Sequence, residues 1–215
     1  MKSSVDLMMF DLDGTLADTG ADLADAVNFT RAYFALASLP HDRIYANVGR
    51  GIDHLIKQSL PEQAEKRFAE ARSVFLEHYE AHLLDHTALY PGVREVLDYF
   101  CRKRRLVVSN KMHRLTEAVV RGLGIADAFD AILGGDSAAE KKPHPALLQL
   151  ALEQFCVAPS RAVMIGDGDT DIEAGKRAGV VTCGVTYGLG NKNDLLAARP
   201  DLVIDSIREL PDYFC

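Results

Sequence analysis

Short apolar runs that alternate with helical patterns are the feature that most limits the fold of this chain. The first run, residues 5–10, stops at Asp11-Leu12-Asp13-Gly14-Thr15, and five similar runs follow at residues 106–108, 131–133, 162–165, 180–183 and 202–204. An uninterrupted apolar run is typical of a strand buried on both faces, and strands that alternate with helices form parallel sheets. The sequence therefore predicts an α/β fold with a doubly wound, Rossmann-like parallel sheet as its core.

Helical patterns lie between most of these runs, at residues 93–101, 116–123, 145–155 and 171–178. Gly179 directly follows the last pattern, where a glycine commonly ends a helix. Each of these segments is long enough to cover one face of the sheet, so the pattern predicts helices packed on the strands.

Residues 21–84 break this alternation, because they contain helical periodicity and no strand candidate. Leu23, Val27 and Phe34 fall on one side of a first helix, and a longer apolar stripe follows at Ala64, Phe68, Ala71, Phe75, Tyr79 and Leu83. Short segments at residues 42–47 and 51–60 lie between them. We therefore expect an all-helical insert at residues 17–85, within a sheet domain made of residues 1–16 and 86–215.

Charge and hydropathy exclude several classes of protein. The 24 Lys and Arg against 31 Asp and Glu give a net charge of −7, which disfavours non-specific binding to nucleic acid or to an anionic membrane. The longest uncharged run, residues 178–191, holds four glycines and is too short to span a bilayer. We expect a cytoplasmic protein with no nucleic-acid or membrane partner.

Polar residues follow the apolar runs at the positions where a doubly wound sheet binds its ligands. They are Asp11 and Asp13 after the first run, Ser109, Asn110 and Lys111 after the second, Lys142 before the helix at 145–155, and Asp167 and Asp171 after the run at 162–165. Four carboxylates in one crevice repel one another, at about 4 kcal/mol for each pair 4 Å apart with an effective dielectric near 20. The site needs a cation, and oxygen-only ligands favour Mg²⁺.

These segments resemble the motifs of the haloacid dehalogenase superfamily of phosphotransferases. Asp11-Leu12-Asp13-Gly14-Thr15 is similar to its first motif, and Ser109-Asn110, Lys142 and Gly166-Asp167-Gly168-x-x-Asp171 are similar to the second, third and fourth, in the expected order. The helical insert after the first motif is similar to the C1-type cap of that superfamily. The resemblance implies a Mg²⁺-dependent phosphomonoester hydrolase that acts through an aspartyl-phosphate intermediate.

The resemblance also implies a role for each residue. Asp11 is then the nucleophile and a metal ligand. Asp13 protonates the leaving oxygen, deprotonates the attacking water and binds the metal through its backbone carbonyl. Asp167 is the third metal ligand, Asp171 lies behind it as a partner of the metal or of the lysine, and Ser109, Asn110 and Lys142 bind the substrate phosphate. An aspartate at position 13 indicates phosphate esters or anhydrides, because the dehalogenase and phosphonatase branches lack it.

Within the superfamily, residues 48–51, 89–93 and 142–145 look like those of phosphoglycolate phosphatases. This implies a small phosphorylated metabolite, 2-phosphoglycolate, as the substrate, with Arg50 as the cation for its non-reacting carboxylate. We expect the chain to be a monomer or a homodimer. Three alternatives stay open. The chain could be a phosphatase for another small phosphate, namely pyrophosphate, a nucleotide or a sugar phosphate. It could also be a β-phosphoglucomutase-like phosphotransferase or a binding module without activity.

Two other motifs have simpler interpretations. His78, His82 and His86 are four residues apart, a spacing that fits a transition metal on one helical face, but we expect a solvated face near the hinge of the insert. Arg102-Lys103-Arg104-Arg105 follows the helix at 93–101, where cations stabilise the negative end of a helix dipole.

Overall fold

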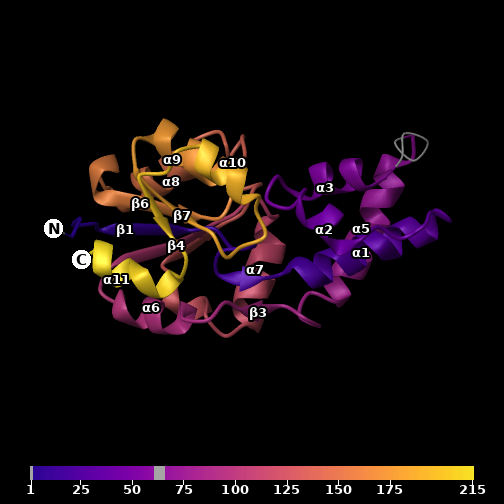
Figure 1. Ribbon diagram of the computed structural model, residues 1–215, viewed down its shortest axis with the longest axis horizontal. Coiled ribbons are helices and arrows are strands. Elements are labelled where there is room, and N and C mark those ends of the chain that lie inside the picture. The colour runs from indigo at the N-terminus through magenta and orange to yellow at the C-terminus, as the bar shows by residue number, and fades with distance from the viewer. Residues whose placement is uncertain (1, 61–65) are drawn as a thin grey trace.

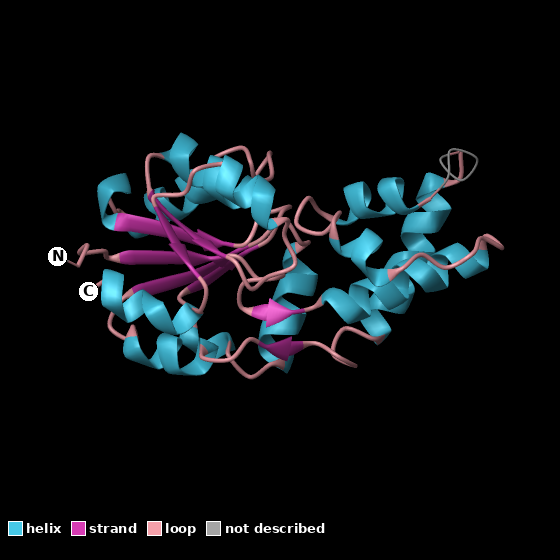
Figure 2. Cartoon of the chain, in the orientation of Figure 1, coloured by secondary structure: helices cyan, strands magenta, loops and turns pink. Residues whose placement is uncertain are grey.

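The chain forms a parallel sheet with helices on both faces, and a second group of helices lies beyond one end of the sheet (Figures 1 and 2). The computed structural model describes residues 2–60 and 66–215. Ala64, which the sequence places in the apolar stripe of the insert, lies outside these residues. The predicted α/β architecture with a helical insert is confirmed.

Six parallel strands make up the sheet, in the order β5-β4-β1-β6-β7-β8. They are β1 (Leu7–Phe10), β4 (Arg104–Val108), β5 (Ala131–Leu133), β6 (Ala162–Gly166), β7 (Val181–Val185) and β8 (Leu202–Ile204). Each corresponds to one predicted apolar run. The central strands end level with one another, because Phe10 pairs with Val107 on β4 and with Ile165 on β6. The residues that follow them therefore emerge together at one edge of the sheet.

Each face of the sheet has its own apolar layer. In β1, Met8 and Phe10 contact one layer and Leu7 and Met9 the other, which explains why the strand reads as an uninterrupted apolar run. The helices on the first face are α6 (Val93–Tyr99), α7 (His113–Gly122) and α11 (Leu210–Tyr213). Those on the second are α8 (Ala146–Phe155) and α9 (Asp169–Ala178), with α10 (Lys192–Ala197) packed against α9. Three short 3₁₀ helices complete this part, at Ala126–Ala128, Pro159–Arg161 and Ile207–Glu209.

The second group of helices has a core of its own. It consists of α1 (Gly20–Tyr33), α2 (His41–Tyr45), α3 (Ile52–Ser59) and α5 (Phe68–Ala81). Leu23 and Val27 of α1 pack there with Ala71, Phe75 and Tyr79 of α5, as the two apolar stripes predict. Of the described residues, none belongs to a helix that is long and apolar enough to cross a membrane.

A two-stranded antiparallel ribbon, which the sequence pattern does not predict, lies where the chain passes between the sheet and these helices. Ala17 and Asp18 form β2 (Ala17–Asp18), which pairs with β3 (Ala88–Leu89). The carboxylate of Asp22 joins the start of α1 to the segment before β3. It accepts hydrogen bonds from the backbone N–H and the hydroxyl of Thr87 at 2.9 and 2.7 Å. The predicted limits of the insert, residues 17 and 85, lie at this crossing, and the division into two domains stays a prediction.

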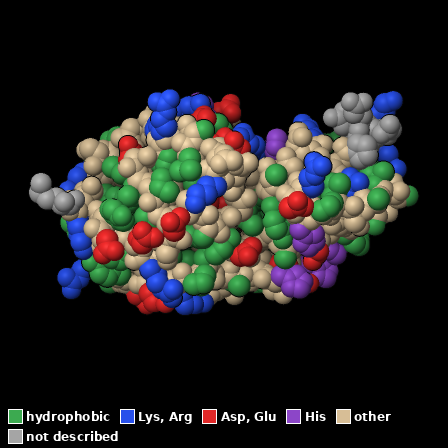
Figure 3. Space-filling model, in the orientation of Figure 1, with side chains coloured by type: hydrophobic (Ala, Val, Ile, Leu, Met, Phe, Trp, Pro, Cys, Tyr) green, Lys and Arg blue, Asp and Glu red, His purple; other side chains and the backbone are tan. Residues whose placement is uncertain are grey.

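The basic run at residues 102–105 and the histidines at positions 78, 82 and 86 contact residues close to them in the fold. Arg105 donates a hydrogen bond to the carbonyl of Leu97 in the last turn of α6, as expected for a cation at the negative end of a helix. The histidines gather on the outside of the helical part (Figure 3). His82 lies 2.7 Å from a carboxylate oxygen of Asp85, and His86 lies 3.8 Å from one of Asp25.

Candidate active site

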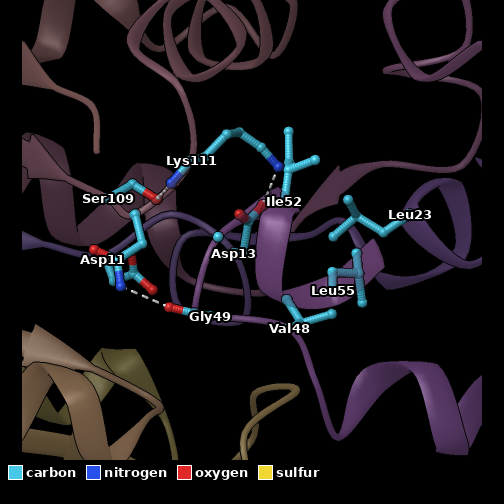
Figure 4. A pocket seen from close by; sticks show the side chains of 11 residues that line it. Asp11, Asp13, Leu23, Val48, Gly49, Ile52, Leu55, Ser109 and Lys111 are labelled. Carbon is cyan, nitrogen blue, oxygen red and sulfur yellow. Dashed lines mark hydrogen bonds and ion pairs between the residues drawn. The ribbon is translucent and has the colours of Figure 1, made fainter. Parts of the chain in front are cut away.

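The polar residues after β1, β4 and β6 meet in one crevice between the sheet and the helical part. Asp11 and Asp13 come from the loop after β1, and Ser109 and Lys111 from the loop after β4 (Figure 4). The opposite wall belongs to the helical part and consists of Leu23, Val48, Gly49, Gly51, Ile52 and Leu55. The carboxyl edge of the sheet therefore carries the site, as the topology predicts.

The loop after β1 is a tight turn that brings Asp167 close to it. The N–H groups of Thr15, Leu16 and Ala17 all donate to the carbonyl of Leu12, at 3.0 to 3.2 Å. Gly14 has a φ of +84°, and a Cβ at this position would lie 2.0 Å from a carboxylate oxygen of Asp167. Only glycine therefore permits this approach. The same oxygen accepts a hydrogen bond of 2.8 Å from the N–H of Gly190.

Lys142 is buried between two carboxylates. Its Nζ lies 3.0 Å from Asp11 Oδ1 and 2.7 Å from Asp171 Oδ1, and it donates a third hydrogen bond to the carbonyl of Val108. Burial disfavours the charge, but the two carboxylates outweigh it and hold the pKa of Lys142 above its ordinary value. Lys142 therefore stays charged and compensates part of the negative charge of the crevice.

Asn110 holds Lys142 and the facing loop in place. Its side-chain carbonyl accepts a hydrogen bond of 2.8 Å from the N–H of Lys142, and its amide donates to the carbonyls of Lys142 and Gly49, both at 2.8 Å. Both amide hydrogens are thus used within the protein. The predicted contact of Asn110 with a substrate phosphate stays a prediction, and so does that of Ser109, which is buried beside it.

Three carboxylates come close enough to share one cation. Asp11, Asp167 and Asp171 each offer an oxygen within 4.8 Å of the other two, and all three are buried. Burial and the neighbouring carboxylates raise the pKa of Asp11 to about 7 and that of Asp167 to about 8. Burial makes the largest contribution to both shifts, and the neighbouring carboxylates add to it, so a cation bound between these groups would stabilise their charged forms. A hard divalent cation, which prefers oxygen ligands, fits this donor set.

Asp171 lies directly in this group of carboxylates, whereas the sequence placed it behind Asp167. Besides its contact with Lys142, its second oxygen accepts a hydrogen bond of 3.1 Å from the N–H of Gly168. Both oxygens are therefore engaged by the protein. This arrangement agrees with a residue that orients the lysine and borders the cation, and its role stays a prediction.

Asp13 does not belong to this group of carboxylates, and its partners are residues that the sequence pattern does not predict. Its Oδ1 accepts hydrogen bonds of 2.7 Å from the hydroxyl of Thr19 and from Nζ of Lys111. Lys111 also donates to the hydroxyl of Tyr79 on α5, at 2.8 Å. The position of Lys111, directly after Ser109-Asn110 at a strand end, is the one sequence signal that pointed to it.

Arg50 lies at the rim rather than inside the crevice. It belongs to the loop between α2 and α3, where Gly49 and Gly51 both have positive φ. Its guanidinium forms an ion pair of 2.6 Å with Asp169, and its side chain is 46% exposed. The loop therefore contacts residues at the edge of the sheet through Arg50 and through the carbonyl of Gly49. The predicted contact of Arg50 with the substrate stays a prediction.

A family model, curated relatives and solved structures all resemble this chain over most of its length. Residues 8–185 match the family model described as haloacid dehalogenase-like hydrolase. The chain is 37% identical to a phosphoglycolate phosphatase of Colwellia psychrerythraea, with 95% of each chain covered, and 36% identical to one of Vibrio vulnificus, with 98% of this chain and 96% of that one covered. A crystal structure described as a predicted phosphoglycolate phosphatase from Haemophilus somnus is similar with a TM-score of 0.92 and 29% identity over 97% of each chain.

Proposed function

The chain belongs to the haloacid dehalogenase-like hydrolase family, and we propose that it is a Mg²⁺-dependent phosphatase that hydrolyses 2-phosphoglycolate through an aspartyl-phosphate on Asp11. The observation that carries this proposal is the meeting of Asp11, Asp167 and Asp171 around one possible cation position, with Lys142 bonded to two of them. The phosphoglycolate phosphatases among the full-length relatives support the substrate.

The two oxygens of Asp11 have different surroundings. Oδ1 accepts a hydrogen bond from Lys142, whereas Oδ2 accepts none from the part of the chain that the structure describes. Oδ2 is therefore available to attack phosphorus. The attack breaks the bond between phosphorus and the leaving oxygen, and Asp13 gives that oxygen a proton. Asp13 then takes a proton from the water that attacks the aspartyl-phosphate, which releases phosphate and restores Asp11.

The proposed reaction also needs a bound cation. We propose that Asp11, Asp167 and the backbone carbonyl of Asp13 hold it, with Asp171 beside them. Bound there, Mg²⁺ supplies positive charge that balances the carboxylates and the phosphoryl oxygens. We further propose that Ser109, Asn110 and Lys142 form the side of the site that faces the substrate phosphate, and that the facing loop brings Arg50 to the substrate from the rim.

The helical wall of the crevice favours a substrate with few polar groups over a sugar phosphate or a nucleotide. Its helical wall consists mainly of apolar side chains, namely Leu23, Val48, Ile52 and Leu55. A sugar phosphate or a nucleotide would leave hydroxyl groups and ring nitrogens against this wall without hydrogen-bond partners. Asp11 and Asp13 are both present and buried, which favours an enzyme over a binding module without activity.

A comparison of kcat/KM across small phosphate compounds tests this proposal. We expect 2-phosphoglycolate to exceed pyrophosphate, AMP and glucose 6-phosphate by about tenfold or more with Mg²⁺ present. Asp11→Asn should abolish all of these activities, because the amide is not a nucleophile. Turnover that survives in Asp11→Asn would contradict the mechanism, and a higher kcat/KM for a sugar phosphate would contradict the substrate.

The remaining expectations about the protein's surroundings stay predictions. These are its cytoplasmic location, its occurrence as a monomer or homodimer and its lack of nucleic-acid and membrane partners.

A further inference from the structure

The ammonium group of Lys111 is buried in the crevice, and one of its three N–H groups has no hydrogen-bond acceptor among the described residues. Its side chain is 2% exposed, and its Nζ contacts Asp13 Oδ1 at 2.7 Å and the hydroxyl of Tyr79 at 2.8 Å. An ammonium has three N–H donors. The third meets no acceptor within residues 2–60 and 66–215. A buried donor without a partner costs free energy, so a site of this kind favours a ligand that supplies an acceptor.

Lys111 is the single cation among the described residues that line the part of the crevice between Asp13 and the helical wall, whereas Lys142 is bonded to Asp11 and Asp171. Figure 4 shows its side chain extending to Asp13, with a hydrogen bond between its amino group and the carboxylate, in a pocket that Ile52 also lines. Arg50 borders an adjoining pocket that shares Asp11 and Asp13 with this one and also contains Asp167 and Asp169. Arg50 thus borders Asp11 and Asp13 together with Asp169, whereas Lys111 borders the pocket that contains Leu23, Ile52 and Leu55.

The position of Lys111 relative to Asp13 defines what it can bind. In the proposed function, Asp13 acts on the leaving oxygen, so this oxygen lies against the Asp13 carboxylate. Lys111 contacts that same carboxylate. An anionic group attached to the carbon next to the leaving oxygen would thus lie within reach of Nζ. In 2-phosphoglycolate, this carbon carries the carboxylate.

We propose that Lys111 is a specificity-determining residue that binds the substrate carboxylate, and that the Tyr79 hydroxyl holds its ammonium group in place. The substrate class is then the phosphate esters of short 2-hydroxycarboxylic acids. This inference rests on the proposed function, because it takes the reacting phosphate to be bound at Asp11. Lys111 follows β4 and is held by Tyr79 of α5. Its contact with the substrate would add to the one predicted for Arg50 at the rim.

The test compares 2-phosphoglycolate with ethyl phosphate, in which a methyl group replaces the carboxylate. The readout is the ratio of the two kcat/KM values, measured with Mg²⁺ present. Any general damage to Asp13 lowers both values and leaves the ratio unchanged. For the wild-type protein we expect a ratio of about 100 or more, because a site built to bind a polar group rejects an analogue that lacks it.

Lys111→Met should reduce this ratio to about ten or less, and Lys111→Arg should retain most of it. Tyr79→Phe keeps the ring and removes only the hydroxyl, so it tests the same contact in a protein whose core is intact. We expect it to raise the KM for 2-phosphoglycolate several-fold and to lower the ratio. The matched control is Tyr33→Phe, because the hydroxyl of Tyr33 is bound to Glu70 on the outside of the same helices.

Each outcome separates this inference from the function on which it rests. An unchanged ratio in Lys111→Met and Tyr79→Phe overturns the role of Lys111, and so does a ratio that collapses only in Arg50→Ala. In both cases hydrolysis of 2-phosphoglycolate by the wild-type protein leaves the proposed function in place. If the wild-type protein does not hydrolyse 2-phosphoglycolate but hydrolyses ethyl phosphate, the proposed substrate and the role of Lys111 both fail.

Discussion

Lys142 shows how closely the charges of this site depend on one another. Its ammonium group contacts Asp11 and Asp171, so two buried carboxylates share one buried cation. The third carboxylate of the group, Asp167, has a backbone N–H and a hydroxyl as partners but no cation among the described residues. This imbalance is why a divalent ion fits the site, and why the loss of one partner should affect the whole group.

Replacing Lys142 by methionine should therefore lower both stability and activity. The loss of one member of a buried ion pair leaves an uncompensated charge, and we expect the free energy of unfolding to fall by about 3–5 kcal/mol. We expect kcat/KM to fall by about 100-fold or more. Urea unfolding and steady-state kinetics measure the two effects.

The neighbouring lysine offers a matched control. Lys141 is only half-buried and has no ion pair within the described residues, so Lys141→Met should change the free energy of unfolding by about 0.5 kcal/mol or less. Equal effects of the two substitutions would contradict the account of the Lys142 ion pairs.

At the scale of elements, the strands and helices of the sheet domain were predictable because each has a pattern of its own. A strand buried on both faces leaves an apolar run, and the residues that follow parallel strands must meet at one edge. Asp11, Ser109, Lys142 and Asp167 could thus be brought together from their order in the sequence alone.

Contacts between the sheet with its covering helices and the second group of helices could not be predicted in this way. The strands β2 and β3 have two residues each, too few to produce a recognisable alternation. The contact between Lys111 and Tyr79 joins a strand end to a helix 32 residues away. The apolar stripe on 68–81 predicts that Tyr79 is buried, but it does not predict that its hydroxyl meets a lysine of the other part. That contact depends on how α5 packs over the crevice.

At the scale of the whole molecule, the buried carboxylates link stability to pH. The pKa values of Asp11 and Asp167, about 7 and about 8, lie above the ordinary value of 3.8. Between about pH 4 and pH 8, the folded metal-free protein thus holds protons that the unfolded chain has released. Its free energy of unfolding should fall as the pH rises through this range.

Mg²⁺ should reverse this loss, because it binds the deprotonated carboxylates of the folded protein. We expect a saturating amount of Mg²⁺ to raise Tm by several degrees at about pH 8 and by much less at about pH 5.5. Thermal unfolding followed by circular dichroism measures the shift. Asp167→Asn should remove most of it, and an equal shift at both pH values would show that these carboxylates do not hold the ion.

The covalent adduct on Asp11 is the central claim, and it can be observed directly. The protein is mixed with 2-phosphoglycolate and Mg²⁺, quenched with acid within the first turnover, and its peptides are analysed by mass spectrometry. We expect one phosphorylated peptide, the one that contains Asp11, and its absence from Asp11→Asn and from samples quenched after the substrate is exhausted. Phosphate on a different residue, or turnover with no phosphorylated peptide, would contradict the mechanism.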